Sequence, residues 1–297
     1  MLVNARRSFG SFVNAALYVR RAYATYQECL RILQRRSRWS SPRSRQEFEC
    51  GVRWAIGCID LGISFVPPPF SVVLNFIGYS GDRDFAHKQL MKAYKDCPLA
   101  LRRPLVGMTL FTYHGVAVHF LGINQPPDRG IMTDFVTNLR TSYPGNIYQP
   151  ALEAALLQTN GNFEDSVHLF DATAKHEFFI KRLSIACLGF KLGSLVFLKR
   201  WSEAEEVAKF FQGEKWSPAT ASFARAIILF EKMQSTEDEG QRLELRKQVC
   251  QYLRAVPELK KVIAGQIYHE LYVLESSKRF MHRPERMVMP IYVSVCR

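Results

Sequence analysis

The sequence predicts an all-α protein made of stacked antiparallel helix hairpins. Three observations support this. Apolar residues recur at helical spacing along nearly the whole chain, strand-type alternation between turn signals is scarce, and short stretches rich in Pro, Gly, Ser or Asn separate the helical segments. With 297 residues, 47% of them apolar, the chain is long enough to bury a sizeable core.

Each helical segment ends next to residues that stop helices for steric reasons. These breaks are SRWSSPRS, VPPP, GYSG, DCP, NQPPDRG, SYPG, TNGN, GEKWSP and STEDEG. We therefore expect thirteen helices, at 5–37, 44–65, 69–77, 82–96, 99–122, 128–142, 147–159, 163–176, 178–199, 202–212, 217–234, 240–255 and 258–280. The short links between them favour neighbours that pack antiparallel.

A repeated spacing of small and aromatic residues marks the second half of the chain. In one unit Gly161 takes the turn, Phe163 opens the second helix and Phe170 continues its face. In the next unit, 38 residues later, Trp201 takes the place of Phe163 and Ala204 follows at the small position. Small residues let paired helices approach closely, and aromatic residues fill the space between hairpins. The pattern predicts a tetratricopeptide-repeat-like α-solenoid, in which each hairpin must stack on a neighbour to bury its apolar face.

The repeats suggest two domains. Residues 1–145 would form an N-terminal helical region, and residues 146–297 would form the tetratricopeptide-like hairpins.

The stretch GYSGDRDF could be a phosphate-binding loop or the start of a helix. A phosphate loop presents free backbone N–H groups at a helix N-terminus. Here Asp82 and Asp84 would occupy the first turn, where they repel phosphate but stabilise the helix by capping it and opposing its dipole. The helix start is therefore favoured, with Gly78, Ser80 and Gly81 forming the sharp turn before it.

The net charge of +13 is uneven, because residues 1–53 hold eleven arginines and three glutamates. Such a segment attracts the phosphates of a membrane surface or of nucleic acid, and a solvated helix face is the plain alternative. We expect Arg35, Arg36 and Arg38 to be the contacts with an anionic surface. Nucleic acid is the less favoured partner, because aromatics such as Trp39 are few among the arginines.

Two apolar or basic segments leave alternatives open. The first 25 residues contain four arginines and no acid, which fits a cleaved mitochondrial presequence, but the helical pattern runs on without a break and favours a retained helix. Residues 105–123 are long enough to span a membrane, but their histidines, threonines and glycines favour a helix buried between neighbours.

The sequence contains no standard catalytic or metal-binding signature. His114 and His119 are five residues apart and cannot share one helix face as metal ligands. The seven cysteines form no CxxC pair, which suggests reduced thiols in a cytoplasmic protein. We expect neither catalysis nor a cofactor.

The run FECGVRWAIGCIDLGISFVPPPFSVVLNFIGYSGDRDFAHKQL resembles the hallmark region of the tetratricopeptide repeat protein 39 family, which includes fungal inclusion-body-clearance proteins. A second resembling segment, RAVPELKKVIAG, contains Pro257. The matching hallmark positions are Gly51, Val52, Gly57, Pro67, Pro68, Phe76, Gly78, Ser80, Gly81 and Asp82.

The repeat spacing and the absence of catalytic motifs predict a non-catalytic scaffold that binds an unidentified protein partner, and the resemblance implies a role in lipid homeostasis or in the clearance of aggregates. Members of that family continue past MVMPIYVSVCR with further helical repeats, so the resemblance also implies that the C-terminal end is incomplete and that the last hairpin lacks its cap. The alternative is a peripheral membrane or lipid-associated factor that uses its basic N-terminal segment. The expected location is the cytoplasm, with attachment to the mitochondrial outer membrane or to lipid droplets as the alternative.

Overall fold

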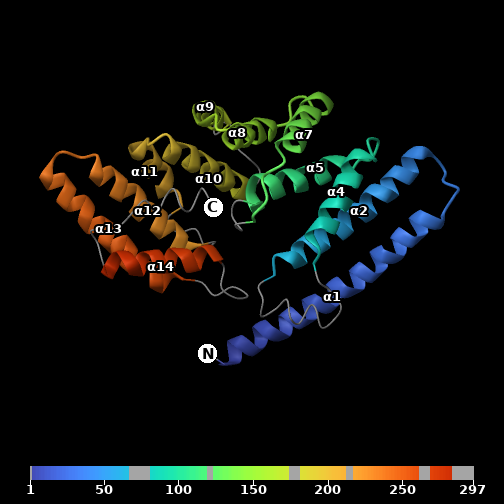
Figure 1. Cartoon of the computed structure of the whole chain (residues 1–297), viewed down its shortest axis with the longest axis horizontal. Helices are drawn as coiled ribbons and strands as arrows, with labels where there is room; N and C mark the ends of the chain where they lie inside the picture. Colours follow the sequence, from blue (N-terminus) through green and yellow to red (C-terminus); the bar gives the residue numbers. More distant parts are fainter. Residues whose placement is uncertain are drawn as a thin grey trace. The chain divides into compact units, whose positions relative to one another are not determined.

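The computed structural model describes residues 2–66, 81–118, 123–173, 181–211, 217–260 and 268–282. Within these ranges every regular element is a helix (Figure 1). The predicted all-α fold is therefore confirmed. The chain divides into two compact units, Met1–Thr112 (unit 1) and Tyr113–Arg297 (unit 2). The predicted boundary at residue 145, drawn from the repeat pattern, stays a prediction.

Unit 1 contains the long helix α1 (Leu2–Arg35), α2 (Pro42–Ser64), α4 (Arg83–Lys95) and α5 (Arg103–Thr112). α2 packs against α1 on one side and α4 on the other, and α4 packs against α5. The α2–α4 contact is close because Gly57 faces Leu90, and a Cβ atom there would lie 2.7 Å from Leu90 Cγ. The predicted helix at 69–77 lies outside the described residues.

Three predicted helix starts in unit 1 are wrong by two to four residues. α1 begins at Leu2 rather than at 5. α2 begins at Pro42 rather than at 44, because the Ser41 hydroxyl accepts a hydrogen bond from Ser44 N and proline is tolerated in a first turn. α5 begins at Arg103 rather than at 99. Leu99 and Leu101 lie in turns instead, where their backbone N–H groups donate to the side chains of α2 residues.

Unit 2 is a series of hairpins (Figure 1). Its elements are the π-helical turn η1 (Tyr113–Ala117), α7 (Arg129–Ser142), α8 (Gln149–Thr159), α9 (Phe163–Thr173), α10 (Lys181–Phe197), α11 (Trp201–Lys209), α12 (Pro218–Gln234), α13 (Glu239–Leu259) and α14 (Tyr268–His282). From α7 to α14 each helix contacts the next, and α14 also contacts α12. The predicted stack of helix hairpins is confirmed.

The core of unit 2 centres on α12, which is buried along most of its length. Phe223, Ile227 and Leu229 are each at most 3% exposed. Side chains from α9, α10, α11, α13 and α14 complete this cluster. Burying each large side chain contributes on the order of 2 kcal/mol, so stacking, not helix propensity, stabilises these short helices.

The predicted helix break at Pro257 is wrong. α13 continues through Pro257 to Leu259, and the helix expected at 258–280 is α14, which begins at Tyr268. Proline lacks the N–H that would donate to the carbonyl of Leu253, four residues earlier. The Ser277 hydroxyl of α14 donates to that carbonyl instead, at 2.7 Å. The helix therefore passes the proline without leaving a buried acceptor unpaired.

Candidate interaction surfaces

The hallmark residues Gly81 and Asp82 fix the start of α4 against the end of α2. Gly81 has φ +61°, and a Cβ atom there would lie 2.6 Å from Ser64 N. Asp82 is the N-cap of α4 and accepts a hydrogen bond from Phe85 N at 2.9 Å. Arg83 donates to both the hydroxyl and the carbonyl of Ser64, at 3.2 Å each. The described part of the hallmark is thus a packed helix junction; Gly78 and Ser80 lie outside it.

The first repeat unit places its aromatic residues against the next hairpin. Gly161 takes φ +86° in the turn between α8 and α9. Phe163 stacks on Phe197 of α10 with ring centroids 4.5 Å apart, and Phe170 lies 6.2 Å from Phe190 of the same helix. These aromatic residues therefore fill the space between successive hairpins.

The small residues of the repeat lie where helices meet. Ala204 of α11 is fully buried, and Trp201 at the start of that helix packs on the core of unit 2. In the preceding hairpin, Ser166 of α9 is also fully buried and donates to the Ala154 carbonyl of α8 at 2.9 Å. A larger side chain at Ala204 or Ser166 would push paired helices apart.

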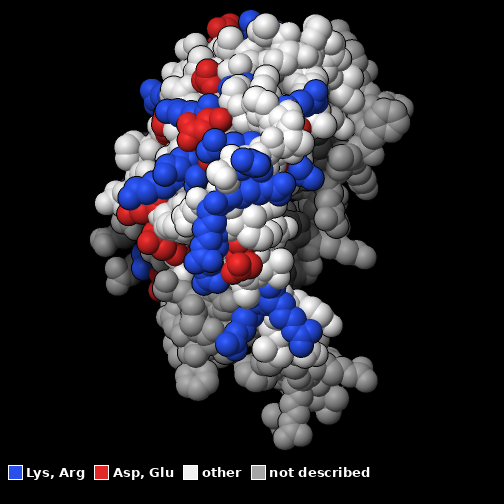
Figure 2. All heavy atoms as spheres, turned by 90° about the vertical axis from the view of Figure 1, so that its right-hand side faces the viewer, with Lys and Arg blue, Asp and Glu red and all other residues white. Residues whose placement is uncertain are grey.

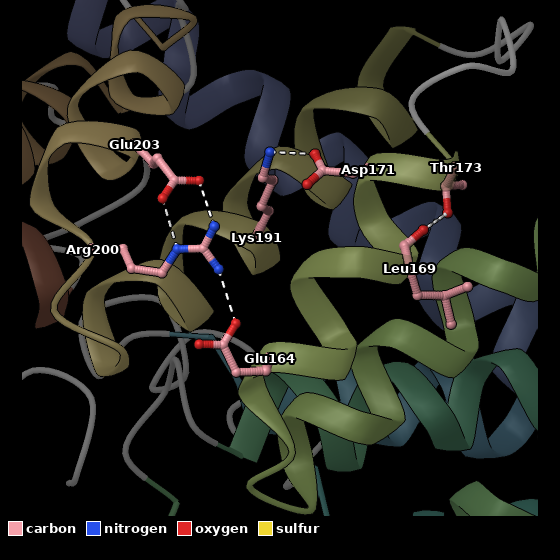
Figure 3. A network of polar contacts seen from close by, with 7 residues as sticks. All are labelled: Glu164, Leu169, Asp171, Thr173, Lys191, Arg200 and Glu203. Carbon is pink, nitrogen blue, oxygen red and sulfur yellow. Dashed lines mark hydrogen bonds and ion pairs between the residues drawn. The ribbon is translucent and has the colours of Figure 1, made fainter.

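Ion pairs tie the hairpins together at the surface (Figure 3). Arg200, in the turn before α11, donates to Glu203 at 2.7 and 2.6 Å and to Glu164 of α9 at 2.9 Å. Lys191 of α10 pairs with Asp171 of α9. The hydrogen bond from Arg200 lowers the pKa of Glu203. The carboxylates of α9 thus serve hairpin stacking, and the partners of Glu164 and Asp171 are too distant in sequence for a local pattern to reveal.

The buried His114 has a structural partner at the start of α7. His114 is buried in η1, and its Nδ1 accepts from the N–H of Asp128, the N-cap of α7. Over the ranges that the structure describes, His, Cys, Asp and Glu form no group of three that could hold a metal ion. In the same ranges no helix has both the length and the apolar character needed to span a bilayer.

The basic segment forms an ordered turn between α1 and α2, which we call the arginine turn (residues 35–45). Arg36 donates through Nε to the carbonyl of Arg38 at 2.9 Å, and its guanidinium lies 4.6 Å from the ring centroid of Trp39. Trp39 donates back to the Arg36 carbonyl at 3.1 Å and packs on Phe48 of α2. Arg36 is therefore held in one orientation.

The arginine turn carries uncompensated positive charge. Within the described residues, Arg35, Arg36, Arg38 and Arg43 are exposed and form no ion pair. Glu49 of α2 pairs with Arg53 at 2.7 Å and with Arg45, the last arginine of the turn, at 4.0 Å. Figure 2 shows many Lys and Arg side chains on one face, with Asp and Glu side chains among them. This surface suits an anionic partner.

A model of the family described as Iml2/Tetratricopeptide repeat protein 39 matches residues 1–294. The chain belongs to this family. It is similar to the tetratricopeptide repeat protein ttc-39B of Caenorhabditis elegans, with 28% identity over 282 residues that cover 92% of this chain and 47% of the relative. It is also similar to the inclusion body clearance protein IML2 of Kluyveromyces lactis, with 23% identity over 208 residues that cover 63% of this chain and 28% of the relative.

The chain thus spans less than half the length of these two members of the Iml2/Tetratricopeptide repeat protein 39 family. No solved structure matches it. Membership makes it a helical-repeat protein, in agreement with the hairpins of unit 2, and stacked repeats of this kind form extended binding surfaces.

The basic surface is larger than the sequence predicted. Arg35, Arg36 and Arg38 were expected to contact an anionic surface, and Arg43 extends the exposed arginines onto α2. A further signal was available in composition: residues 1–53 contain eleven arginines and no lysine. Arginine presents a planar fork that binds phosphate or carboxylate with two hydrogen bonds, whereas lysine acts as a point charge.

Proposed function

We propose that the chain is a non-catalytic helical-repeat scaffold that binds a protein partner, in lipid homeostasis or in the clearance of aggregated protein. The continuous stack from α7 to α14 carries this proposal. Stacked hairpins offer a long surface whose side chains can vary without disturbing the core. The Kluyveromyces lactis relative is named an inclusion body clearance protein, which supports the second of these processes.

Two exposed apolar residues in unit 2 are candidates for partner contact. Phe210, which follows α11, is 67% exposed, and Leu243 of α13 is 56% exposed. Single exposed apolar side chains are common on proteins, and we choose these two because an aromatic side chain such as Phe210 is the kind that anchors a protein–protein contact. Replacing them does not open the core, because neither lies in it.

Affinity capture tests the scaffold proposal. The wild type, the double variant Phe210→Ser/Leu243→Ser and the control Lys247→Ser are each used to capture proteins from an extract of the source cells. We expect a protein captured at fixed stoichiometry by the wild type and the control but not by the double variant. Capture of the same proteins by all three chains would exclude these two residues as the contact, and capture of none would count against the scaffold.

The second candidate function is attachment to an anionic membrane surface through the arginine turn. Its support is the set of exposed arginines that no carboxylate neutralises within the described residues. Each such residue near an anionic bilayer contributes about 1 kcal/mol of binding free energy, and salt screens this attraction.

Cosedimentation with vesicles of phosphatidylcholine and phosphatidylserine tests the second candidate. The charge-reversed variant Arg35→Glu/Arg36→Glu/Arg38→Glu should lose binding. A variant with the same net charge, Arg242→Glu/Arg246→Glu/Arg254→Glu on the exposed face of α13, should retain it. Equal loss in both variants would show that net charge, not the arginine turn, drives binding.

A further inference from the structure

Three leucines near the arginine turn are exposed to solvent. Leu99 and Leu101 lie in the turn between α4 and α5, and Leu105 lies in the first turn of α5; they are 55%, 69% and 51% exposed. By contrast, their neighbours Cys97 and Ala100 are buried. The turn therefore directs its small residues inward and its large apolar residues outward, the reverse of what folding alone favours.

The α4–α5 turn is held firmly on the start of α2. Leu99 N donates to Gln46 Oε1 at 2.9 Å, and Leu101 N donates to Glu47 Oε1 at 2.8 Å. The buried thiol of Cys97 hydrogen-bonds to Cys50 of α2, and this bond, together with burial, raises the pKa of Cys97. The leucines therefore project from a fixed backbone.

The same contacts place the leucines beside the arginine turn. Gln46 and Glu47, which accept the two hydrogen bonds, stand three and four positions after Arg43 on α2. Residues at this spacing share one helix face. The arginine turn itself, RRSRWSSPRSR, holds five arginines and no acid. One end of unit 1 thus combines exposed leucines with exposed arginines.

This combination fits a phospholipid bilayer better than a soluble polyanion. A free phosphate or a nucleic acid backbone would engage the arginines but offers nothing to leucine side chains. At a membrane surface, apolar side chains enter the boundary between head groups and acyl chains while cations contact lipid phosphates. Arg36, oriented by Trp39, presents its remaining N–H groups without first losing rotamer freedom.

We propose that Leu99, Leu101 and Leu105 together with the arginine turn form a docking surface for an anionic phospholipid bilayer. The leucines insert at the head-group boundary, and the arginines bind lipid phosphates. This inference rests on the second candidate function, membrane attachment, and adds to it an apolar insertion site that is distant from the basic segment in sequence.

Vesicle binding by the full chain tests the inference. Four chains are compared on vesicles of phosphatidylcholine with phosphatidylserine: the wild type, Leu99→Ser/Leu101→Ser, the triple Arg→Glu variant of the arginine turn, and the matched apolar control Phe210→Ser/Leu243→Ser. Far-ultraviolet circular dichroism and melting temperature establish that each chain is folded. We expect the leucine variant to lose about tenfold in partition coefficient, because two partly inserted leucines are removed.

Salt dependence separates the two contributions. Raising the ionic strength should weaken the wild type but leave a residual binding that the leucine variant lacks, because insertion is not screened. If the leucine variant binds like the wild type while the arginine variant does not, the insertion site is refuted and electrostatic attachment stands. If the wild type binds no vesicles, or binds soluble polyglutamate and not vesicles, both the insertion site and membrane attachment are refuted.

Discussion

Replacing Gly81 by alanine tests the junction between α2 and α4 directly. The residue has φ +61°, a conformation that costs a residue with a Cβ atom about 1–2 kcal/mol. The added Cβ atom would also lie 2.6 Å from Ser64 N and 2.9 Å from Ile63 C, and such overlap with backbone costs about 1–3 kcal/mol. We expect Gly81→Ala to lower the free energy of unfolding of unit 1 by about 2–5 kcal/mol.

Two other glycines separate these contributions. Gly161 has φ +86° but open space around its Cα. Gly161→Ala should therefore lower the free energy of unfolding only by the cost of placing alanine at positive φ, about 1–2 kcal/mol. Gly62 lies inside α2 with open space, so Gly62→Ala should stabilise the chain by up to about 1 kcal/mol. Urea unfolding followed by circular dichroism measures all three. A cost for Gly81→Ala no larger than that for Gly161→Ala would refute the close packing of Gly81 on α2.

Three further substitutions have definite expected outcomes. Burial raises the pKa of the Asp60 carboxyl group from 3.8 to about 6. The stability contributed by its neutral form is therefore complete below the unfolded pKa and is lost as pH rises through about 6. Asp60→Asn should raise the free energy of unfolding by about 2–3 kcal/mol near neutral pH and by little at about pH 4, as measured by urea unfolding at both pH values. Arg200→Ala removes exposed ion pairs, including that with Glu203, and should lower the free energy of unfolding by less than about 1 kcal/mol at low salt and not measurably at high salt. A larger loss of stability that does not depend on salt would contradict this. Ser277→Ala leaves the buried carbonyl of Leu253 without its donor and should lower the free energy of unfolding by about 1–3 kcal/mol, whereas an unchanged midpoint would show that the hydroxyl is dispensable.

The helices could be predicted from sequence where their signals are local. Asp82 caps α4 through a backbone N–H three residues away, and Gly161 makes the turn between α8 and α9 by its own conformation. Pro257 misled the prediction because the donor that replaces its missing N–H belongs to Ser277, twenty residues later in another helix. Similarly, the start of α5 depends on Gln46, which no local pattern connects to residue 99.

The sequence reveals one part of the proposed membrane-binding surface and not the other. The arginine turn is visible in the sequence because charge can be counted without knowing the fold. Leu99 and Leu101 are not visible, because the sequence places them in a predicted helix at 99–122 without showing which of its side chains face solvent. Only the buried positions of Cys97 and Ala100 and the bonds to α2 show that these leucines face solvent.

Native mass spectrometry of the chain, gently purified from its source cells, tests the central claim that this helical-repeat chain is a scaffold. We predict a complex of the chain with another protein at one fixed stoichiometry, lost in the Phe210→Ser/Leu243→Ser variant. A chain that carries only lipid would favour membrane attachment instead. A chain that is always bare, in preparations where its fold is intact, would contradict the scaffold account.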